Sequence, residues 1–240
     1  MKNILAGALI LASTLLTAQT YKLKSDEMKG QIVTLKGEVL NGYIKLKGDT
    51  RSPWNNQESV EFFTEDAMAD GKVKGKEREK YRPDDIKAYI AGDRYFEAQK
   101  FSLMKMTMGM GIAKWYFIER MVDGDISLYR FYDTPDAVTV TTTEAERVAY
   151  EEELESMRTN PNLLLKKDDE MTTLQKVDFA AYISKCPEVQ EKYKTGGYGI
   201  EPFHQDAETK LGKFIAKQVN SQQVMVVLPQ ILEDYNACVE

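Results

Sequence analysis

Four methionines alternate with other residues in segment 102–115. Met104, Met106, Met108 and Met110 occupy every second position. Successive side chains of a β-strand point to opposite faces, so in a strand all four thioethers would share one face. Thioethers are soft ligands that select Cu(I). One hypothesis is therefore a Cu(I)-handling protein that uses the strand from Met104 to Met110.

Two other interpretations compete with copper. Methionine side chains also fill irregular cores, and the polar Lys105 and Thr107 between them are typical of a half-buried strand. Alternate residues of a strand lie about 7 Å apart, so one ion could not bind all four sulfurs unless the strand were bent. We expect a strand with its methionines in the core, and keep copper and a hydrophobic partner surface as alternatives.

The chain contains a single histidine, His204. It lies in a stretch that also contains a proline and acidic residues, and no nucleophile motif accompanies it, which argues against a Ser-His-Asp triad. A structural zinc site normally draws on several His or Cys ligands at short spacing. We therefore expect His204 to lie in a solvent-exposed loop.

Pairs of carboxylates are another candidate for chemistry, because two of them placed across a cleft can hydrolyse glycosides. The pairs are Asp84 with Asp85, Asp123 with Asp125, and Asp168 with Asp169. Each lies at a turn, and turn formation explains aspartate there without any catalysis. A carboxylate-based hydrolase stays an alternative, but we assign no catalytic residue and expect a protein that is not an enzyme and needs no cofactor.

The chain has two cysteines, Cys186 and Cys238. In an oxidising compartment such thiols tend to pair, and a bond would close a loop of about 50 residues. We expect a disulfide between them. The alternative is two buried free thiols.

The N-terminus predicts export. Lys2 precedes an apolar run that ends in small residues, the pattern of a secretory signal peptide, with cleavage expected after Ala18. The run is shorter than the roughly 20 residues of a membrane span, although an uncleaved anchor is the alternative. The formal net charge is −6, and an acidic protein repels phosphate backbones, so we expect no nucleic-acid partner. We expect no membrane span in the mature chain, which would be soluble and lie in the periplasm or outside the cell.

Hydrophobic alternation predicts strands first and helices later. Strands are expected in 30–46 as a hairpin, and in 59–64, 86–90, 95–110, 115–119 and 126–131, with an Asp-Gly turn before the last of these. A further hairpin is expected in 163–174. Helices are expected after residue 175, one of them beginning at Pro187.

This order indicates an α+β fold with an antiparallel sheet, a meander, a roll or a partly open barrel, followed by a small helical part. The expected segments are a signal peptide 1–18, a flexible N-terminus 19–28, a β-rich domain 29–133, an acidic helical or irregular insertion 134–161 and a mainly helical region 162–240.

The motifs "GQIVTLKGEVLNGYIKL", "YRPDDIKAYIAGDRYFEA", "ISLYRFYD", "YISKCPEVQEKY" and "YNAC" occur in this order between about residues 30 and 238. The chain thereby resembles an uncharacterised family of exported proteins common in Bacteroidetes-type bacteria. The resemblance implies export and a similar fold, and it supplies no activity and no catalytic residue. The methionine run and the acidic segment around 141–160 depart from the family pattern.

These observations favour a non-enzymatic binding or interaction protein of the periplasm or cell exterior, with a protein or a glycan as its partner.

Overall fold

The computed structural model describes residues 21–48, 51–135, 143–203 and 222–240. The expected signal peptide and His204 lie outside these residues. No helix in the described ranges combines the length and the hydropathy needed to cross a membrane.

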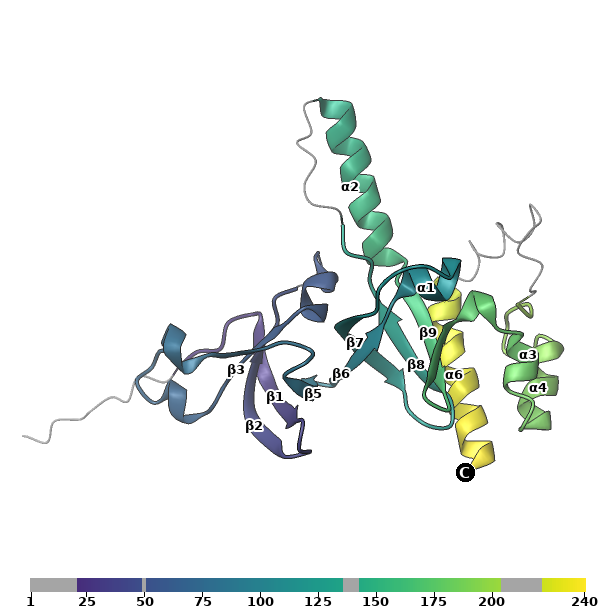
Figure 1. Cartoon of the computed structure of the whole chain (residues 1–240), viewed down its shortest axis with the longest axis horizontal. Helices are drawn as coiled ribbons and strands as arrows, with labels where there is room; N and C mark the ends of the chain where they lie inside the picture. The colour runs from purple at the N-terminus through teal and green to yellow at the C-terminus, as the bar shows by residue number, and fades with distance from the viewer. Residues whose placement is uncertain (1–20, 49–50, 136–142, 204–221) are drawn as a thin grey trace, which may run out of the picture.

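Ten strands form one open antiparallel sheet in the order β10-β9-β8-β7-β6-β5-β1-β2-β3-β4 (Figure 1). Neighbours in the sheet are neighbours in sequence except where β1 pairs with both β2 and β5. The strands are β1 Glu27–Thr34, β2 Val39–Lys45, β3 Val60–Phe63, β4 Glu79–Tyr81, β5 Ile86–Ala91, β6 Arg94–Phe101, β7 Lys114–Val122, β8 Ser127–Phe131, β9 Asn162–Lys167 and β10 Glu170–Thr173. The expected antiparallel α+β fold is thus confirmed, as an open sheet rather than a closed barrel.

The helices lie mostly in the second half of the chain. They are α1 Leu103–Met108, α2 Glu144–Thr159, α3 Phe179–Tyr182, α4 Pro187–Lys194 and α6 Gln222–Val239, with short 3-10 turns η1 Pro53–Gln57, η2 Asp66–Met68, η3 Gly75–Glu77 and η4 Leu174–Lys176. Pro187 occupies the first turn of α4, as expected. The acidic α2 buries none of its residues and projects away from the sheet (Figure 1).

The expected strand through the methionines is wrong. Strand β6 ends at Phe101, and α1 follows at once. The Ser102 hydroxyl caps the helix by accepting from the Lys105 N–H at 3.1 Å, and Gly109 ends it in the left-handed conformation at φ 75°. The two caps enclose six residues, three of which are methionines, and methionine is a good helix former.

Two of the expected segment boundaries also need correction. The segment 19–28, expected to be flexible, contains the start of β1, where buried Glu27 pairs with Arg78 at 2.6 Å. The sheet does not end at residue 133, because β9 and β10 continue it beyond the α2 segment. The predicted hairpin in 163–174 is confirmed, but it belongs to the sheet and not to a separate helical region.

The core has two faces around β7, β8 and β9. On one face Leu128 and Leu165 pack against α6, whose buried side chains include Leu228 and Leu232. On the other face Tyr129 and its neighbours pack against α1. A third cluster fills the sheet around β1, β2, β3 and β5.

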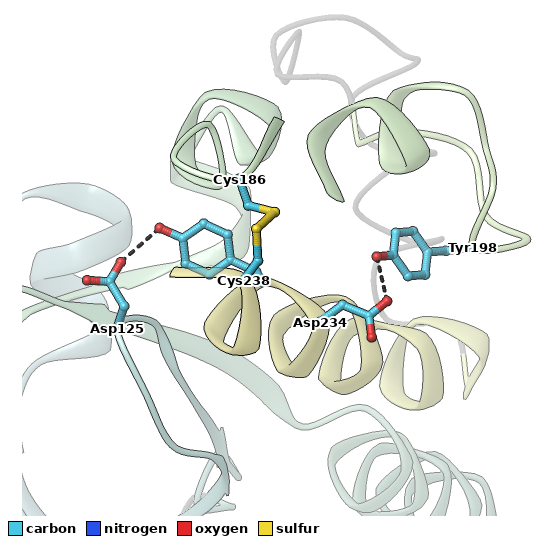
Figure 2. Close-up of a disulfide and its surroundings, with 6 residues drawn as sticks. Asp125, Cys186, Tyr198, Asp234 and Cys238 are labelled. Carbon is cyan, nitrogen blue, oxygen red and sulfur yellow. Dashed lines mark hydrogen bonds between the residues drawn. A yellow bond between two sulfur atoms is a disulfide. The ribbon is translucent and has the colours of Figure 1, made fainter. Parts of the chain in front are cut away.

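The predicted disulfide is confirmed. Cys186, at the start of α4, is bonded to Cys238, in the last turn of α6 (Figure 2). Cys186 is fully buried, whereas Cys238 is exposed. The bond ties α6 to the α3–α4 segment across 52 positions of the chain.

Replacing both cysteines, Cys186→Ala with Cys238→Ala, should lower the free energy of unfolding by about 4 kcal/mol, because the unfolded chain regains the entropy of a loop of this length. Chemical denaturation would measure it. Cys238→Ala alone is the informative comparison, since an exposed cysteine is costly to replace only if it is bonded. A near-silent Cys238→Ala variant would contradict the cross-link.

Candidate functional site

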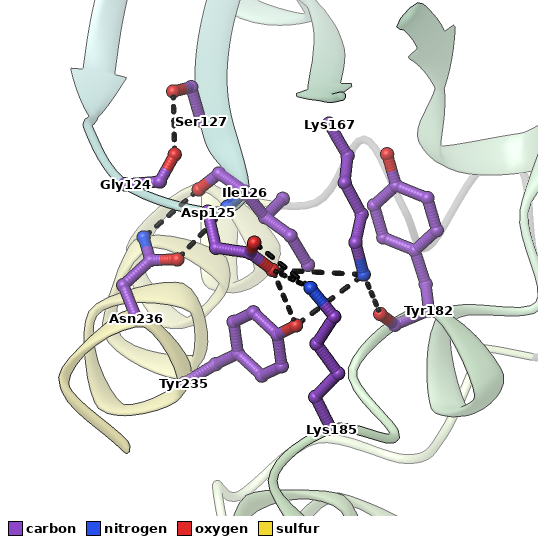
Figure 3. A network of polar contacts seen from close by, with 9 residues as sticks. All are labelled: Gly124, Asp125, Ile126, Ser127, Lys167, Tyr182, Lys185, Tyr235 and Asn236. Carbon is purple, nitrogen blue, oxygen red and sulfur yellow. Dashed lines mark hydrogen bonds and ion pairs between the residues drawn. The ribbon is translucent and has the colours of Figure 1, made fainter. Parts of the chain in front are cut away.

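The turn between β7 and β8 is fastened to α6 by one buried amide. Asn236 accepts a hydrogen bond from the Ile126 N–H and donates to the Ile126 carbonyl, both at 3.0 Å (Figure 3). It also donates to the Asp123 carbonyl at 3.1 Å. A Cβ at Gly124, where φ is 145°, would lie 2.4 Å from the Asn236 side chain. The predicted Asp-Gly turn is therefore also the docking point of α6, and only glycine permits the approach.

A charged cluster surrounds Asp125 beside this turn. Asp125 accepts a hydrogen bond from the Tyr235 hydroxyl at 2.8 Å, and the ammonium groups of Lys185 and Lys167 lie 3.1 and 3.8 Å from it (Figure 3). The Tyr235 hydrogen bond and the lysines lower the pKa of Asp125, while burial and Asp125 itself raise the pKa of Tyr235. Lys167 also donates to the Tyr182 carbonyl at 3.0 Å. The carboxylate lies between two ammonium groups and a phenol from separate elements, so we assign the cluster to holding the hairpin, β9 and α6 together.

A second ion cluster lies within the sheet. The Glu119 carboxylate accepts two hydrogen bonds from Arg94, at 2.8 and 2.9 Å, and two from Arg130, at 3.0 and 2.7 Å. Burial alone would raise the pKa of Glu119, but the Arg94 hydrogen bond and the charge of Arg130 together lower it. This cluster joins β6, β7 and β8 through the attraction of one carboxylate to two guanidinium groups.

The carboxylate pairs named from the sequence do not converge. Asp85 accepts from the Arg82 N–H within its turn, and Asp123 and Asp125 face different partners, Arg120 and Tyr235. In the described residues, every carboxyl group with a resolved shift has a lowered pKa: Glu27, Asp70, Glu119, Asp125 and Asp234. The general acid of a glycosidase needs the opposite shift.

The methionines are not the buried row that we expected. Met106 packs against the core, but Met104, Met108 and Met110 are 55%, 70% and 63% exposed. An α-helix turns about 100° per residue, so Met106 is separated from Met104 and Met108 instead of sharing their face. Among the residues that the structure describes, no group of three or more His, Cys, Asp or Glu side chains is placed to hold a metal ion.

An open pocket of about 590 Å³ lies at the start of β7. It is lined by Glu58, Arg82, Pro83, Asp84, Lys114, Trp115, Tyr116 and Thr134. Trp115 is 45% exposed there, whereas the other tryptophan of the chain, Trp54, is 7% exposed. Burial, with Glu58 and Asp133 nearby, raises the pKa of Tyr116, which keeps its phenol protonated. The pocket thus offers an aromatic face with hydrogen-bonding groups of both charges.

Buried amides fix the wall of this pocket. Gln57, next to Glu58, donates to the Tyr132 carbonyl at 2.8 Å and accepts from the Tyr132 N–H at 2.6 Å. Asn56 makes the same two-way contact with the backbone of Gly48, at 2.7 and 2.9 Å. These bonds hold η1 against the end of β8, so Glu58 and Thr134 keep their spacing without a ligand.

Sequence reasoning missed this site. Its residues come from four separate segments, and only their meeting in the sheet makes a pocket. The available signal was Trp115, a large aromatic residue at the very start of a strand, but alternation with Phe117 favoured burial for it.

Comparison with known proteins adds no further assignment: no family model, no curated protein and no solved structure matches the chain.

Removing the hydrogen bonds of the Asn236 side chain should destabilise the protein strongly. Asn236→Ala leaves the Ile126 N–H and two turn carbonyls without partners, which should cost about 3 kcal/mol in the free energy of unfolding. Urea denaturation would measure it, with exposed Asn55→Ala as the matched control. An equal loss of unfolding free energy in the two variants would show that the Asn236 side chain does not hold α6 in place.

The Glu119 cluster should make the free energy of unfolding depend on pH in the acid range. Because the pKa of Glu119 is lower in the folded chain than in the unfolded chain, its contribution is complete above the ordinary value of 4.5 and is lost as the pH falls through the folded pKa. Glu119→Gln should cost about 2 kcal/mol at pH 7, less than for a fully buried pair because both arginines are partly exposed.

The difference between wild type and Glu119→Gln should therefore shrink below pH 4.5. Unfolding midpoints measured across the acid range would test this, with exposed Glu38→Gln as the control. A difference that is constant with pH would contradict the role of the Glu119 charge.

Proposed function

We propose that the protein is an exported, non-enzymatic binding protein that holds a neutral glycan in the pocket beside Trp115. The observation that carries the proposal is the half-exposed indole of Trp115 in a fixed pocket with charged groups of both signs. Sugar rings present an apolar C–H face that stacks on an indole, and hydroxyl groups around it that donate and accept hydrogen bonds. The size of the pocket lies in the range typical of small-ligand sites.

Charge favours a neutral ligand over an ionic one. The pocket combines two carboxylates, Glu58 and Asp84, with two cations, Arg82 and Lys114. A phosphorylated ligand would meet the carboxylates, and a polycation would meet the arginine and lysine. Hydroxyl groups accept from Arg82 and Lys114 and donate to Glu58 and Asp84, so they can satisfy all four.

Export is the second part of the proposal. The predicted signal peptide, the resemblance to exported proteins and the disulfide support it, because disulfides persist in oxidising compartments and are rare in the cytosol. Cleavage near Ala18 and a place in the periplasm or outside the cell belong to the same proposal. A carboxylate-based hydrolase is less well supported, since the carboxyl groups with a shifted pKa, such as Glu119 and Asp125, are shifted downward by basic or phenolic partners, whereas the general acid of a glycosidase needs a raised pKa.

Tryptophan fluorescence gives a direct test. The chain has two tryptophans, and Trp115 is by far the more exposed, so iodide should quench mainly Trp115. A panel of neutral oligosaccharides of glucose, galactose, mannose and N-acetylglucosamine should contain a member that protects Trp115 from iodide. Titration calorimetry would then give the affinity for that sugar.

Trp115→Ala should weaken this binding by at least about tenfold, because stacking on the indole is lost. Trp115→Phe should keep part of it, and Ile112→Ala, a more exposed neighbour outside the lining, should keep all of it. Thermal unfolding should be almost unchanged in each variant, since these side chains are exposed. A panel without any binder, or a sugar that binds Trp115→Ala as well as wild type, would refute the glycan proposal.

A further inference from the structure

Three large apolar side chains are exposed within the seven residues 104–110, shortly after β6. Met104, Met108 and Met110 each leave more than half of their surface in solvent. Clustered exposed apolar residues are a marker of binding surfaces, whereas single ones need no explanation. Their shared chemistry, a neutral thioether at the end of a flexible side chain, narrows what they can bind.

Helix α1 places two of these sulfurs side by side. Met104 and Met108 are four residues apart, so they are neighbours on one helix face, with Cβ atoms about 6 Å apart. The opposite face carries Leu103 and Met106, which pack against the core. The helix is thereby fixed in orientation, and the Met104–Met108 face points away from the core.

The chain then turns back and brings the backbone around Met110 to the start of α1. Gly109 and Gly111 have φ values of 75° and 116°, which reverse the chain after α1. A Cβ at Gly111 would lie 3.3 Å from the Met104 Cβ and 2.6 Å from the Ser102 hydroxyl oxygen. Gly111 therefore lies against the start of α1, so the backbone of its neighbour Met110 lies close to Met104.

We propose that Met104, Met108 and Met110 form a surface site for a soft monovalent metal ion, Cu(I) under biological conditions. Thioether sulfur selects Cu(I) over hard cations, which prefer oxygen ligands. Each methionine has three rotatable bonds, so three of them on adjacent backbone positions can turn their sulfurs to one ion. The nearby Lys105 is a cation, which disfavours divalent ions more than monovalent ones.

The site differs from a strand of four methionines in one testable respect. A strand would require Met106, which lies between Met104 and Met108. In the folded chain Met106 faces the core and is not a ligand. The proposal is also independent of the glycan pocket, whose lining includes none of the methionines.

The test is a metal titration in which the disulfide stays intact. Thiol reductants are avoided, because free thiolates of Cys186 and Cys238 would bind soft metals themselves. Ag(I), a redox-inert soft ion, is added first, and Cu(I) is then supplied as its acetonitrile complex without oxygen, in competition with a coloured chelator. NMR of protein labelled at the methionine methyl carbons reports which thioethers contact the ion.

We expect one equivalent of Ag(I) or Cu(I) to bind and to shift the methyl signals of Met104, Met108 and Met110, while that of Met106 stays in place. Each of Met104→Leu, Met108→Leu and Met110→Leu should weaken binding by at least about tenfold. Met106→Leu, from the same segment, should bind like wild type. All these replacements preserve side-chain size, so folding should be unaffected.

Absence of binding, equal binding by the triple Met→Leu variant, or a loss in Met106→Leu as large as in the others would overturn the site. Glycan binding measured on the same variants should be unchanged, so failure of this site and failure of the Trp115 pocket can be told apart.

Discussion

The arrangement of the second half of the molecule depends on how α6 is held against the sheet. Its apolar face covers Leu128 and Leu165 on β8 and β9, and this burial is non-directional. Direction comes from polar contacts in the last turns of the helix. Asn236 forms hydrogen bonds with the backbone of the β7–β8 turn, the Tyr235 hydroxyl donates a hydrogen bond to Asp125, and Cys238 forms a disulfide with Cys186. These contacts fix the last turn of α6 against the β7–β8 turn.

This anchoring leaves the opposite face of β7, β8 and β9 to a smaller cover. There α1 contributes only Leu103 and Met106 to the core, because a six-residue helix has few inward positions. Its remaining methionines face solvent. If α1 served only to cover the core, polar residues would be expected at those exposed positions. The thioethers there are consistent with a binding role.

The pocket proposed to bind a glycan and the proposed metal site are held in place in different ways. The pocket is built from segments far apart in sequence and depends on buried amides such as Gln57 to hold them in place. The methionine site is local, and its geometry follows from one helical turn and one chain reversal. Substitutions in distant parts of the sheet should therefore disturb the pocket sooner than the methionine site.

The sequence by itself determined the antiparallel strands with their hairpins and the helix starting at Pro187, because alternation and turn residues are local signals. It favoured a bond between Cys186 and Cys238 over two free thiols, and the folded chain shows that bond. It could not determine whether the methionine segment is a strand or a helix. Alternation favoured a strand, whereas the caps at Ser102 and Gly109 favoured a helix. Packing of Leu103 and Met106 against the sheet selects the helix. It also could not show that β9 extends the same sheet as β8 across the α2 segment, or that Trp115 would meet Glu58, Arg82 and Thr134. Those contacts join residues distant in sequence, and only the folded chain brings them together.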